Sequence, residues 1–244
     1  MNKHLGRRDF ISSSSTLILS ATLSHAPFRA LASSSPQSGR IGIIGLDTSH
    51  SVAFTKALNG NSNNVAASHF KIVAAYPNGS ADIESSVKRI PGYTEEVKKY
   101  GVEIVGSIKE LLEKVDFVCL ETNDGRPHLQ QALEVFKAGK PVFIDKPVAS
   151  SLADTIAIYE LAKHYKVPVF SSSSLRYMET AQLVAKGKIG NVLGADCFSP
   201  ATFEQTHPDF FWYGIHGVEL LYTVMGIGCK QVKRTFSNDV DVVV

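Results

Sequence analysis

Residues 41–50 read IGIIGLDTSH, an apolar run that reaches a glycine and then turns polar. A β-branched run that ends in glycine and opens a helix is typical of a strand followed by a phosphate-binding loop. In that loop one glycine makes a tight turn, a second lets the backbone approach a pyrophosphate, and a third lets helix and strand pack closely. Gly45 stands at the first place, but Asp47 and His50 stand at the other two.

The carboxylate of Asp47 allows two opposite predictions. If it faces a bound phosphate, it obstructs the anion and repels it; one like-charge pair at ~4 Å costs about 4 kcal/mol at an effective dielectric constant of roughly 20. If residues 47–49 instead cap the helix that follows, the carboxylate accepts the first backbone N–H groups of that helix. Those amides are the ones that would otherwise bind the phosphate.

The end of the second strand-like run departs from the dinucleotide-binding pattern as well. An acidic residue usually stands there to hold the ribose hydroxyls. Here the run ends in Tyr76-Pro77, Asp82 comes several residues later, and no arginine follows directly for a 2′-phosphate. Both diagnostic contacts for a dinucleotide are therefore altered.

Two residues further along the chain are suited to proton transfer. Lys146, in IDKP, follows an apolar run at the edge of the sheet where open α/β folds bind ligands. An ammonium there can hydrogen-bond a substrate hydroxyl and favour its alkoxide; the alternative is a solvated loop lysine. His216, in GIHGVELL, has a side chain whose ordinary pKa of ~6.5 suits a general base, and the alternative is a buried structural histidine. Glu219 lies three residues on and can share a helical face with it.

The segments that position these residues alternate between strand and helix patterns. Strands are predicted at residues 40–46, 70–76, 102–105, 116–121, 141–144 and 167–170, and helices at 51–59, 93–101, 107–115, 127–139 and 151–166. This alternation predicts an α/β domain over residues 40–170, a Rossmann-like doubly wound parallel sheet with helices on both faces.

The rhythm changes after residue 170. A helix pattern at 179–190, a strand pattern at 192–198 and an aromatic-rich helix at 210–226 predict the start of an α+β domain over residues 171–244. The chain ends inside the β-branched run DVDVVV, and an unpaired apolar strand is an aggregation hazard. We therefore expect this domain to be truncated, with further sheet strands beyond Val244.

The N-terminal segment has the order of an export signal: basic residues, a mild apolar stretch and the small-residue site Ala30-Leu31-Ala32. Arg7-Arg8 followed by Asp9-Phe10 resembles a twin-arginine motif. We predict a signal peptide over residues 1–32, a linker over 33–39, and a periplasmic or otherwise exported protein. The alternatives are an ordinary signal or a disordered basic tail.

Charge and cysteine content exclude some classes of function. The whole chain has a net charge of +2, and residues 1–32 alone carry +3, so the mature chain has a net charge near −1. A chain with this charge offers a nucleic-acid partner no electrostatic support. No apolar run reaches the ~18 residues of a membrane span. The cysteines have no metal-site spacing and predict no disulfide; Cys119, in an apolar run, is predicted to be core.

Four stretches in this order resemble the Gfo/Idh/MocA family of sugar and polyol oxidoreductases: residues 42–50, ETNDGRPHLQQALEVFKAGK, VFIDKPVA and YGIHGVELLYTVMG. The resemblance covers nearly all of residues 40–244. It implies an N-terminal Rossmann domain that holds NAD or NADP. It also implies a C-terminal domain that forms the substrate pocket and often an oligomer interface, so we expect a homo-oligomer.

The resemblance also implies roles for individual residues. IDKP is similar to the family's Glu-Lys-Pro motif with Asp145 in place of Glu, and Lys146 and His216 match its catalytic lysine and histidine. Trp212 replaces an aspartate that many members have one helical turn earlier. The implied cofactor contacts are Gly45, Leu46, Asp47, Thr48, Ser49, His50, Thr122, Asn123, Asp145 and Lys146. The candidate substrate contacts are Arg176, Tyr213 and Glu219.

The function expected from these residues is an exported oxidoreductase that transfers hydride between a tightly held NAD(P) and a sugar or polyol hydroxyl. A close variant is a redox-assisted glycosidase. The alternative from another class is a non-catalytic carbohydrate-binding protein on a degenerate dehydrogenase scaffold, which the altered residues Asp47, Tyr76 and Trp212 favour. A metal site made by Asp47, His50, His128 and His216 has no support in their spacing, and none is predicted.

Overall fold

The computed structural model describes residues 39–60, 67–237 and 240–244. The predicted signal peptide and most of the predicted linker lie outside these residues. Within the described part, no helix is long and apolar enough to cross a bilayer.

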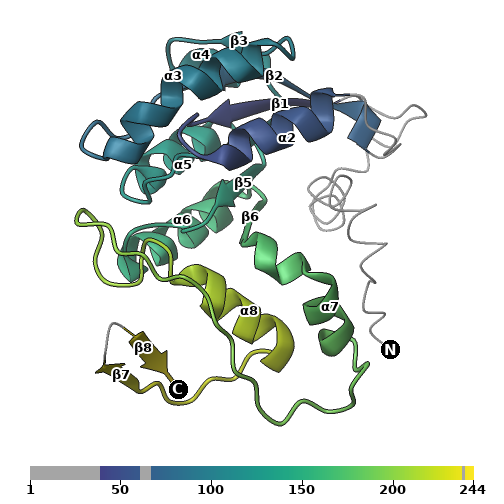
Figure 1. Cartoon of the computed structure of the whole chain (residues 1–244). Helices are drawn as coiled ribbons and strands as arrows, with labels where there is room; N and C mark the ends of the chain where they lie inside the picture. The colour runs from purple at the N-terminus through teal and green to yellow at the C-terminus, as the bar shows by residue number, and fades with distance from the viewer. Residues whose placement is uncertain (1–38, 61–66, 238–239) are drawn as a thin grey trace.

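A parallel sheet of six strands forms the N-terminal part, in the order β3-β2-β1-β4-β5-β6 (Figure 1). Its strands are β1 (Gly39–Ile44), β2 (Phe70–Tyr76), β3 (Glu103–Ile104), β4 (Phe117–Leu120), β5 (Val142–Asp145) and β6 (Val169–Ser172). Strands β1, β2 and β3 follow one another toward one edge of the sheet, and the chain then returns past β2 and β1 to form β4 on the other side of β1. The direction of the strand order therefore reverses between β1 and β4. Open sheets of this kind bind ligands outside the carboxyl ends of the strands at such a reversal. The Rossmann-like prediction is confirmed.

Helices cover both faces of this sheet. They are α2 (Ser49–Asn59), α3 (Glu84–Lys98), α4 (Ile108–Lys114), α5 (His128–Lys137) and α6 (Leu152–Tyr165), with a short 3-10 turn, η2 (Ala67–His69), before β2. One buried cluster packs α4, α5 and α6 against one face, and a second packs α2 and α3 against the other. Cys119 of β4 lies in the second cluster, paired in register with Ile43 and Phe143 of the neighbouring strands. It is core, as predicted.

Helix α3 is longer than the sequence predicted. The expected helix began at residue 93, but α3 begins at Glu84 and contains Pro91. A proline inside a helix removes one N–H donor and leaves the carbonyl four residues earlier unpaired. Here that carbonyl belongs to Val87, whose side chain is half exposed, so water can reach this side of the helix. The predicted start at residue 93 is therefore wrong, because α3 continues through Pro91 and Gly92.

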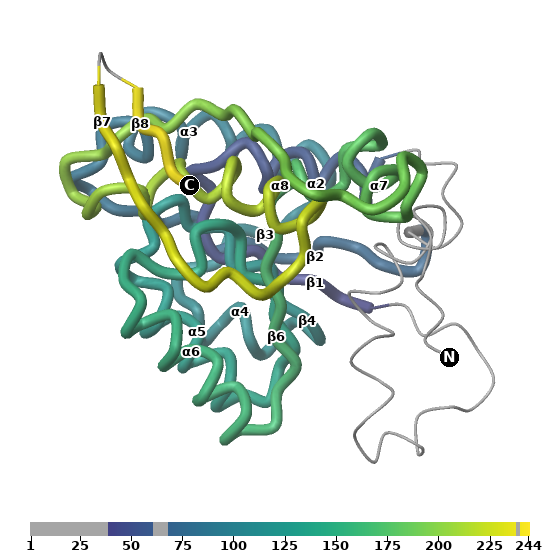
Figure 2. The backbone as a smooth tube through the Cα atoms, turned by 90° about the horizontal axis from the view of Figure 1, so that it is seen from below, coloured from purple at the N-terminus to yellow at the C-terminus, as the bar shows by residue number. Residues whose placement is uncertain are grey.

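The C-terminal part packs below the carboxyl edge of the sheet. It contains η3 (Ser174–Tyr177), α7 (Glu179–Ala185), α8 (Ile215–Met225) and an antiparallel hairpin of β7 (Arg234–Ser237) and β8 (Val240–Val243). Helices α7 and α8 contact each other, and the hairpin stands apart from the large sheet (Figures 1 and 2). The strand predicted at 192–198 is wrong, because these residues form no ladder. Leu193 and Phe198 there are almost fully exposed, so no neighbouring strand or core supports them.

Candidate active site

A pocket of about 340 Å³ lies between the carboxyl edge of the large sheet and the C-terminal part. It brings together residues from the start of α2, from α3, from the segments after β4, β5 and β6, from the segment before α8 and from the first turn of α8. The lining residues are Thr48, Ser49, His50, Arg89, Tyr93, Asn123, Lys146, Ser174, Leu175, Ser199, Pro200, Tyr213 and His216. Seven residues predicted from the sequence are among them, Lys146 and His216 included.

The tight turn of the loop is present. Gly45 has φ +93°, and a Cβ there would lie 2.4 Å from the backbone nitrogen of Thr122. Only glycine fits both the conformation and the space. Leu46 is fully buried behind this turn, so it supports the loop from below and does not reach the pocket.

Asp47 points away from the pocket and is fully buried. Its Oδ1 accepts the backbone N–H of Asn123 at 2.9 Å, and its Oδ2 accepts the Ser86 hydroxyl at 2.8 Å. Burial raises its pKa, although these hydrogen bonds oppose the shift. Neither sequence prediction for this side chain holds: it faces no phosphate position, and it does not cap α2. Thr48 is the N-cap of that helix, and its hydroxyl accepts the N–H of His50.

The segment after β2 packs directly against Asp47. A Cβ on Gly79 would lie 2.4 Å from Asp47 Oδ2, so only a glycine allows this approach. Arg89 donates to the Asp47 carbonyl at 3.4 Å and lines the pocket together with Tyr93. Neither residue was predicted: Arg89 precedes the helix start predicted at residue 93, and Tyr93 lies in no motif that marks a site. The two residues are four apart and share one helical face.

Asp145, Lys146 and His50 form a charged group at the end of β5. Asp145 Oδ2 lies 2.8 Å from His50 Nδ1 and 3.8 Å from Lys146 Nζ. The Asp145 side chain is only 3% exposed, whereas that of His50 is 30% exposed and reaches the pocket. His50, which replaces the third loop glycine, therefore holds its imidazole near Lys146, the predicted catalytic lysine, through their shared contact with Asp145.

His216 faces Lys146 across the pocket. Its Nδ1 lies 2.7 Å from the Ser173 hydroxyl, and its ring packs on Tyr213 with centroids 4.7 Å apart. Lys146 Nζ lies 5.9 Å from the centroid of the same tyrosine ring. Burial, together with the nearby Lys146 charge, lowers the pKa of His216. The histidine is therefore neutral at neutral pH, as a proton acceptor must be.

Arg176 and Glu219 do not line the pocket. Glu219 is buried, accepts the Ser173 backbone N–H at 2.7 Å and forms an ion pair with Arg176. This pair ties α8 to the segment after β6. Trp212, which takes the place of the family's aspartate, packs on the buried His207 with ring centroids 4.8 Å apart.

Hydrogen bonds from Thr122 and His128 hold the loop after β4 in place. Thr122 is buried and donates to Gln131, and Asn123 reaches the pocket. Both ring nitrogens of His128 face carbonyls, that of Thr122 at 2.7 Å and that of Val148 at 3.0 Å. His128 therefore links the loops after β4 and β5, and no metal group with Asp47 or His216 forms in the described residues.

Comparison with known proteins agrees with this arrangement. The sequence model of an oxidoreductase family with an NAD-binding Rossmann fold, Gfo/Idh/MocA, matches residues 39–173, more than half of the chain. The chain belongs to this family. No curated protein sequence matches it.

Solved structures similar to the chain include proteins from three bacteria. A dehydrogenase from Clostridium difficile has 17% identity and a TM-score of 0.57, with 85% of this chain and 65% of that one covered. An NAD-binding protein from Listeria innocua has 20% identity and a TM-score of 0.59, with 82% and 59% covered. A probable dehydrogenase from Thermotoga maritima has 20% identity and a TM-score of 0.58, with 80% and 56% covered. The chain thus spans less than two thirds of the length of each of these structures.

The residues present fit the phosphate groups of the dinucleotide that Gfo/Idh/MocA proteins bind. The first turn of α2, which has no acidic residue, opens into the pocket, and Arg89 lies beside it. Backbone N–H groups at a helix start, with an arginine close by, bind phosphate well. The Asp47 carboxylate, which would repel the phosphates in one of its two predicted orientations, is buried behind the loop.

Proposed function

We propose that the chain is an exported oxidoreductase that transfers hydride between a tightly held NAD or NADP and a hydroxyl of a sugar or polyol. One observation carries this proposal: Lys146 and His216, from separate parts of the chain, line the same pocket as the N-terminus of α2. When bound, the dinucleotide supplies the hydride acceptor or donor. We propose that Thr48, Ser49, His50, Arg89 and Asn123, which line the pocket, hold it.

The chain's own residues move the proton of the substrate hydroxyl. The Lys146 ammonium, nearly buried, hydrogen-bonds the hydroxyl oxygen and stabilises negative charge on it. The neutral His216 accepts the proton, and its contact with Ser173 fixes the orientation of the ring. The Tyr213 ring lies close to both groups.

Export requires that the dinucleotide stay bound, because the free cofactor is scarce outside the cytoplasm. Folding before export, which the twin-arginine-like segment suggests, lets the chain take up NAD(P) first. A closed cycle then reduces and reoxidises it in place. A redox-assisted glycosidase follows the same cycle and is distinguished by the release of sugar without net cofactor change.

The first test is mass spectrometry of the small molecules that the purified, folded chain releases on denaturation. We expect about one NAD or NADP per chain. If the folded protein releases none and takes none up at millimolar supply, it is no NAD(P) enzyme, and the carbohydrate-binding alternative replaces this proposal.

The second test is Lys146→Met, with Lys137→Met on the exposed end of α5 as the matched control. Loss of one positioned proton-transfer group typically costs about 10²–10⁴-fold in rate. We expect a loss of that size in hydride transfer from a panel of sugars and polyols, followed by nicotinamide absorbance, while bound dinucleotide stays at the level of the control. Unchanged turnover in Lys146→Met contradicts the role of Lys146.

A further inference from the structure

Glu121 is the residue that follows β4, and the mechanism above gives it no task. Its side chain is fully buried, and neither carboxyl oxygen has a hydrogen-bond partner in the described residues. Burying a carboxyl group without a partner is costly, and almost all buried polar groups are paired. The described residues therefore give this carboxyl no partner, and a bound group from outside the chain can provide one.

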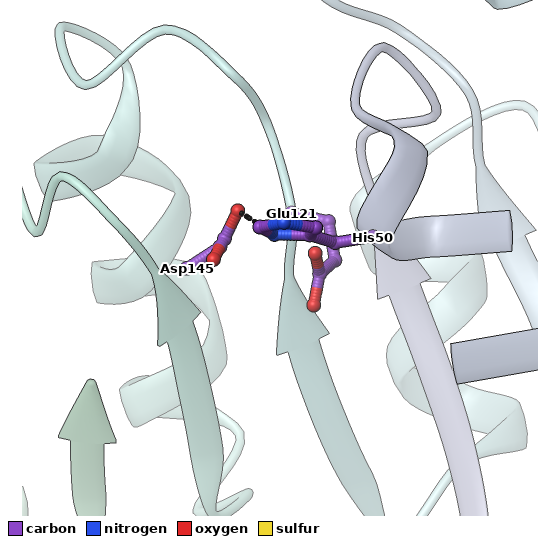
Figure 3. A group of neighbouring side chains, drawn as sticks. All are labelled: His50, Glu121 and Asp145. Carbon is purple, nitrogen blue, oxygen red and sulfur yellow. Dashed lines mark hydrogen bonds and ion pairs between the residues drawn. The ribbon is translucent and has the colours of Figure 1, made fainter. Parts of the chain in front are cut away.

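Two other potential metal ligands face Glu121. Asp145 comes from the end of the adjacent strand β5 and His50 from the first turn of α2, and Figure 3 shows the three side chains pointing toward one another. One ligand atom from each lies within 4.8 Å of those of the other two. His50 Nδ1 and Asp145 Oδ2 are already 2.8 Å apart, which suits adjacent ligands of one ion.

We propose that His50, Glu121 and Asp145 bind a divalent first-row transition-metal ion such as Mn²⁺ or Zn²⁺. An imidazole with two carboxylates is a ligand set that such ions accept. Ligand atoms at ~2.1 Å from one ion are at most about 4.2 Å apart, so binding draws the group slightly together. The ion gives Glu121 the partner that it lacks, and the two carboxylates balance its charge.

The geometry also gives the ion an entry path and open coordination positions. Of the three ligands only His50 lines the pocket, so the ion enters from that side and its remaining positions face the pocket. Lys146 contacts Asp145 at 3.8 Å and lies next to these positions. A metal-bound water or substrate oxygen would therefore lie beside the lysine, in a pocket that already favours negatively charged oxygen.

The site is tested with Mn²⁺ alone, on the full chain after treatment with a chelator and with no dinucleotide added. Free Mn²⁺ gives a six-line electron paramagnetic resonance signal that is lost on binding. We expect one Mn²⁺ per chain that Zn²⁺ displaces, and at least about tenfold weaker binding in Glu121→Gln, which keeps the shape of the side chain. Asp145→Asn is expected to weaken binding similarly.

Glu160→Gln and His164→Gln, on the exposed side of α6, are the matched controls and should bind Mn²⁺ as the wild type does. Circular dichroism confirms that each variant is folded. The proposal is overturned if the wild type binds no Mn²⁺ at 1 mM, or if Glu121→Gln binds it as tightly as the controls do. Because the assay follows Mn²⁺ binding and not hydride transfer, either result is independent of the proposed oxidoreductase activity.

Discussion

At the scale of single residues, the Asp47 side chain tethers its own loop to three other segments. Its carboxylate joins the loop after β1 to the loop after β4 through Asn123 and to α3 through Ser86. The close approach of Gly79 adds the segment after β2. The side chain thus fixes the shape of the phosphate-binding loop from behind.

Replacement of Asp47 tests this tether. Asp47→Ala leaves a buried N–H of Asn123 without an acceptor, and we expect the free energy of unfolding to fall by about 1–3 kcal/mol in urea denaturation. Asp47→Asn keeps one acceptor and should cost less. Equal stability of Asp47→Ala and the wild type would show that the tether contributes nothing.

The same residue gives a pH dependence with a definite sign. Burial raises the pKa of Asp47 above its ordinary value of 3.8. Between pH 3.8 and the higher pKa of the folded state, the folded chain therefore holds a proton on Asp47 that the unfolded chain has released. The free energy of unfolding of the wild type therefore falls as the pH rises from 3.8 through the higher folded value. Asp47→Asn lacks this contribution, so we expect it to gain stability relative to the wild type over that range. Parallel stability curves for the two proteins would contradict the raised pKa.

The sequence predicted which residues reach the pocket better than it predicted the directions of their side chains. Lys146 and His216 were found because each lies in a recognisable local pattern, and the structure brings both to the pocket. The direction of the Asp47 side chain depends on Asn123 and Ser86, which are distant in the chain. Glu121 was passed over because it ends an apolar strand and no sequence signal shows that its carboxyl is unpaired.

At the scale of elements, the six strands of the large sheet were predictable because each is a short run between turn residues. Helix starts were predictable where a side chain caps them, as Ser107 and Ser151 do at α4 and α6. Helix α3 has no such cap, since Ile83 precedes it without a side-chain hydrogen bond, and its start was missed. The interior Pro91 is accepted because it lies on a solvent-facing side, which is a property of the packed molecule.

The end of α6 offers a stabilising substitution. Lys166 follows this helix in the left-handed conformation, with φ 56°, and its side chain is exposed. Glycine adopts this conformation without strain, so we expect Lys166→Gly to raise the free energy of unfolding by roughly 0.5–1 kcal/mol. Lys163→Gly, inside the last turn of the same helix, should lower it by a similar amount. A loss of stability in Lys166→Gly would mean that the conformation is not strained in the folded chain.

At the scale of the whole molecule, exposed apolar side chains gather in the C-terminal part. Leu193, Phe198 and Ile227 are each about nine-tenths exposed or more, and Val240 and Val242 of the hairpin are more than half exposed. Apolar surface of this extent, next to strands with unpaired edges, favours association with another chain. It supports the proposal of a homo-oligomer through this part.

Light scattering coupled to size exclusion tests that proposal. We expect the wild type to self-associate at micromolar concentration and Val240→Lys/Val242→Lys to shift toward the monomer, because a lysine pair replaces apolar contact with charge repulsion. The control is Lys230→Glu/Lys233→Glu, in the exposed segment before β7. A monomeric wild type at the highest soluble concentration would exclude association through the hairpin.

The placement of the three cysteines has a consequence for chemical labelling. Cys229 is exposed, Cys197 is partly buried, and Cys119 is enclosed in β4, where burial raises its pKa well above the ordinary value. Alkylating reagents attack thiolates, so Cys229 reacts in the folded chain while Cys119 reacts only after the central strands separate. The rate at which Cys119 is modified therefore reports how often the large sheet opens, and the measurement needs no engineered cysteine.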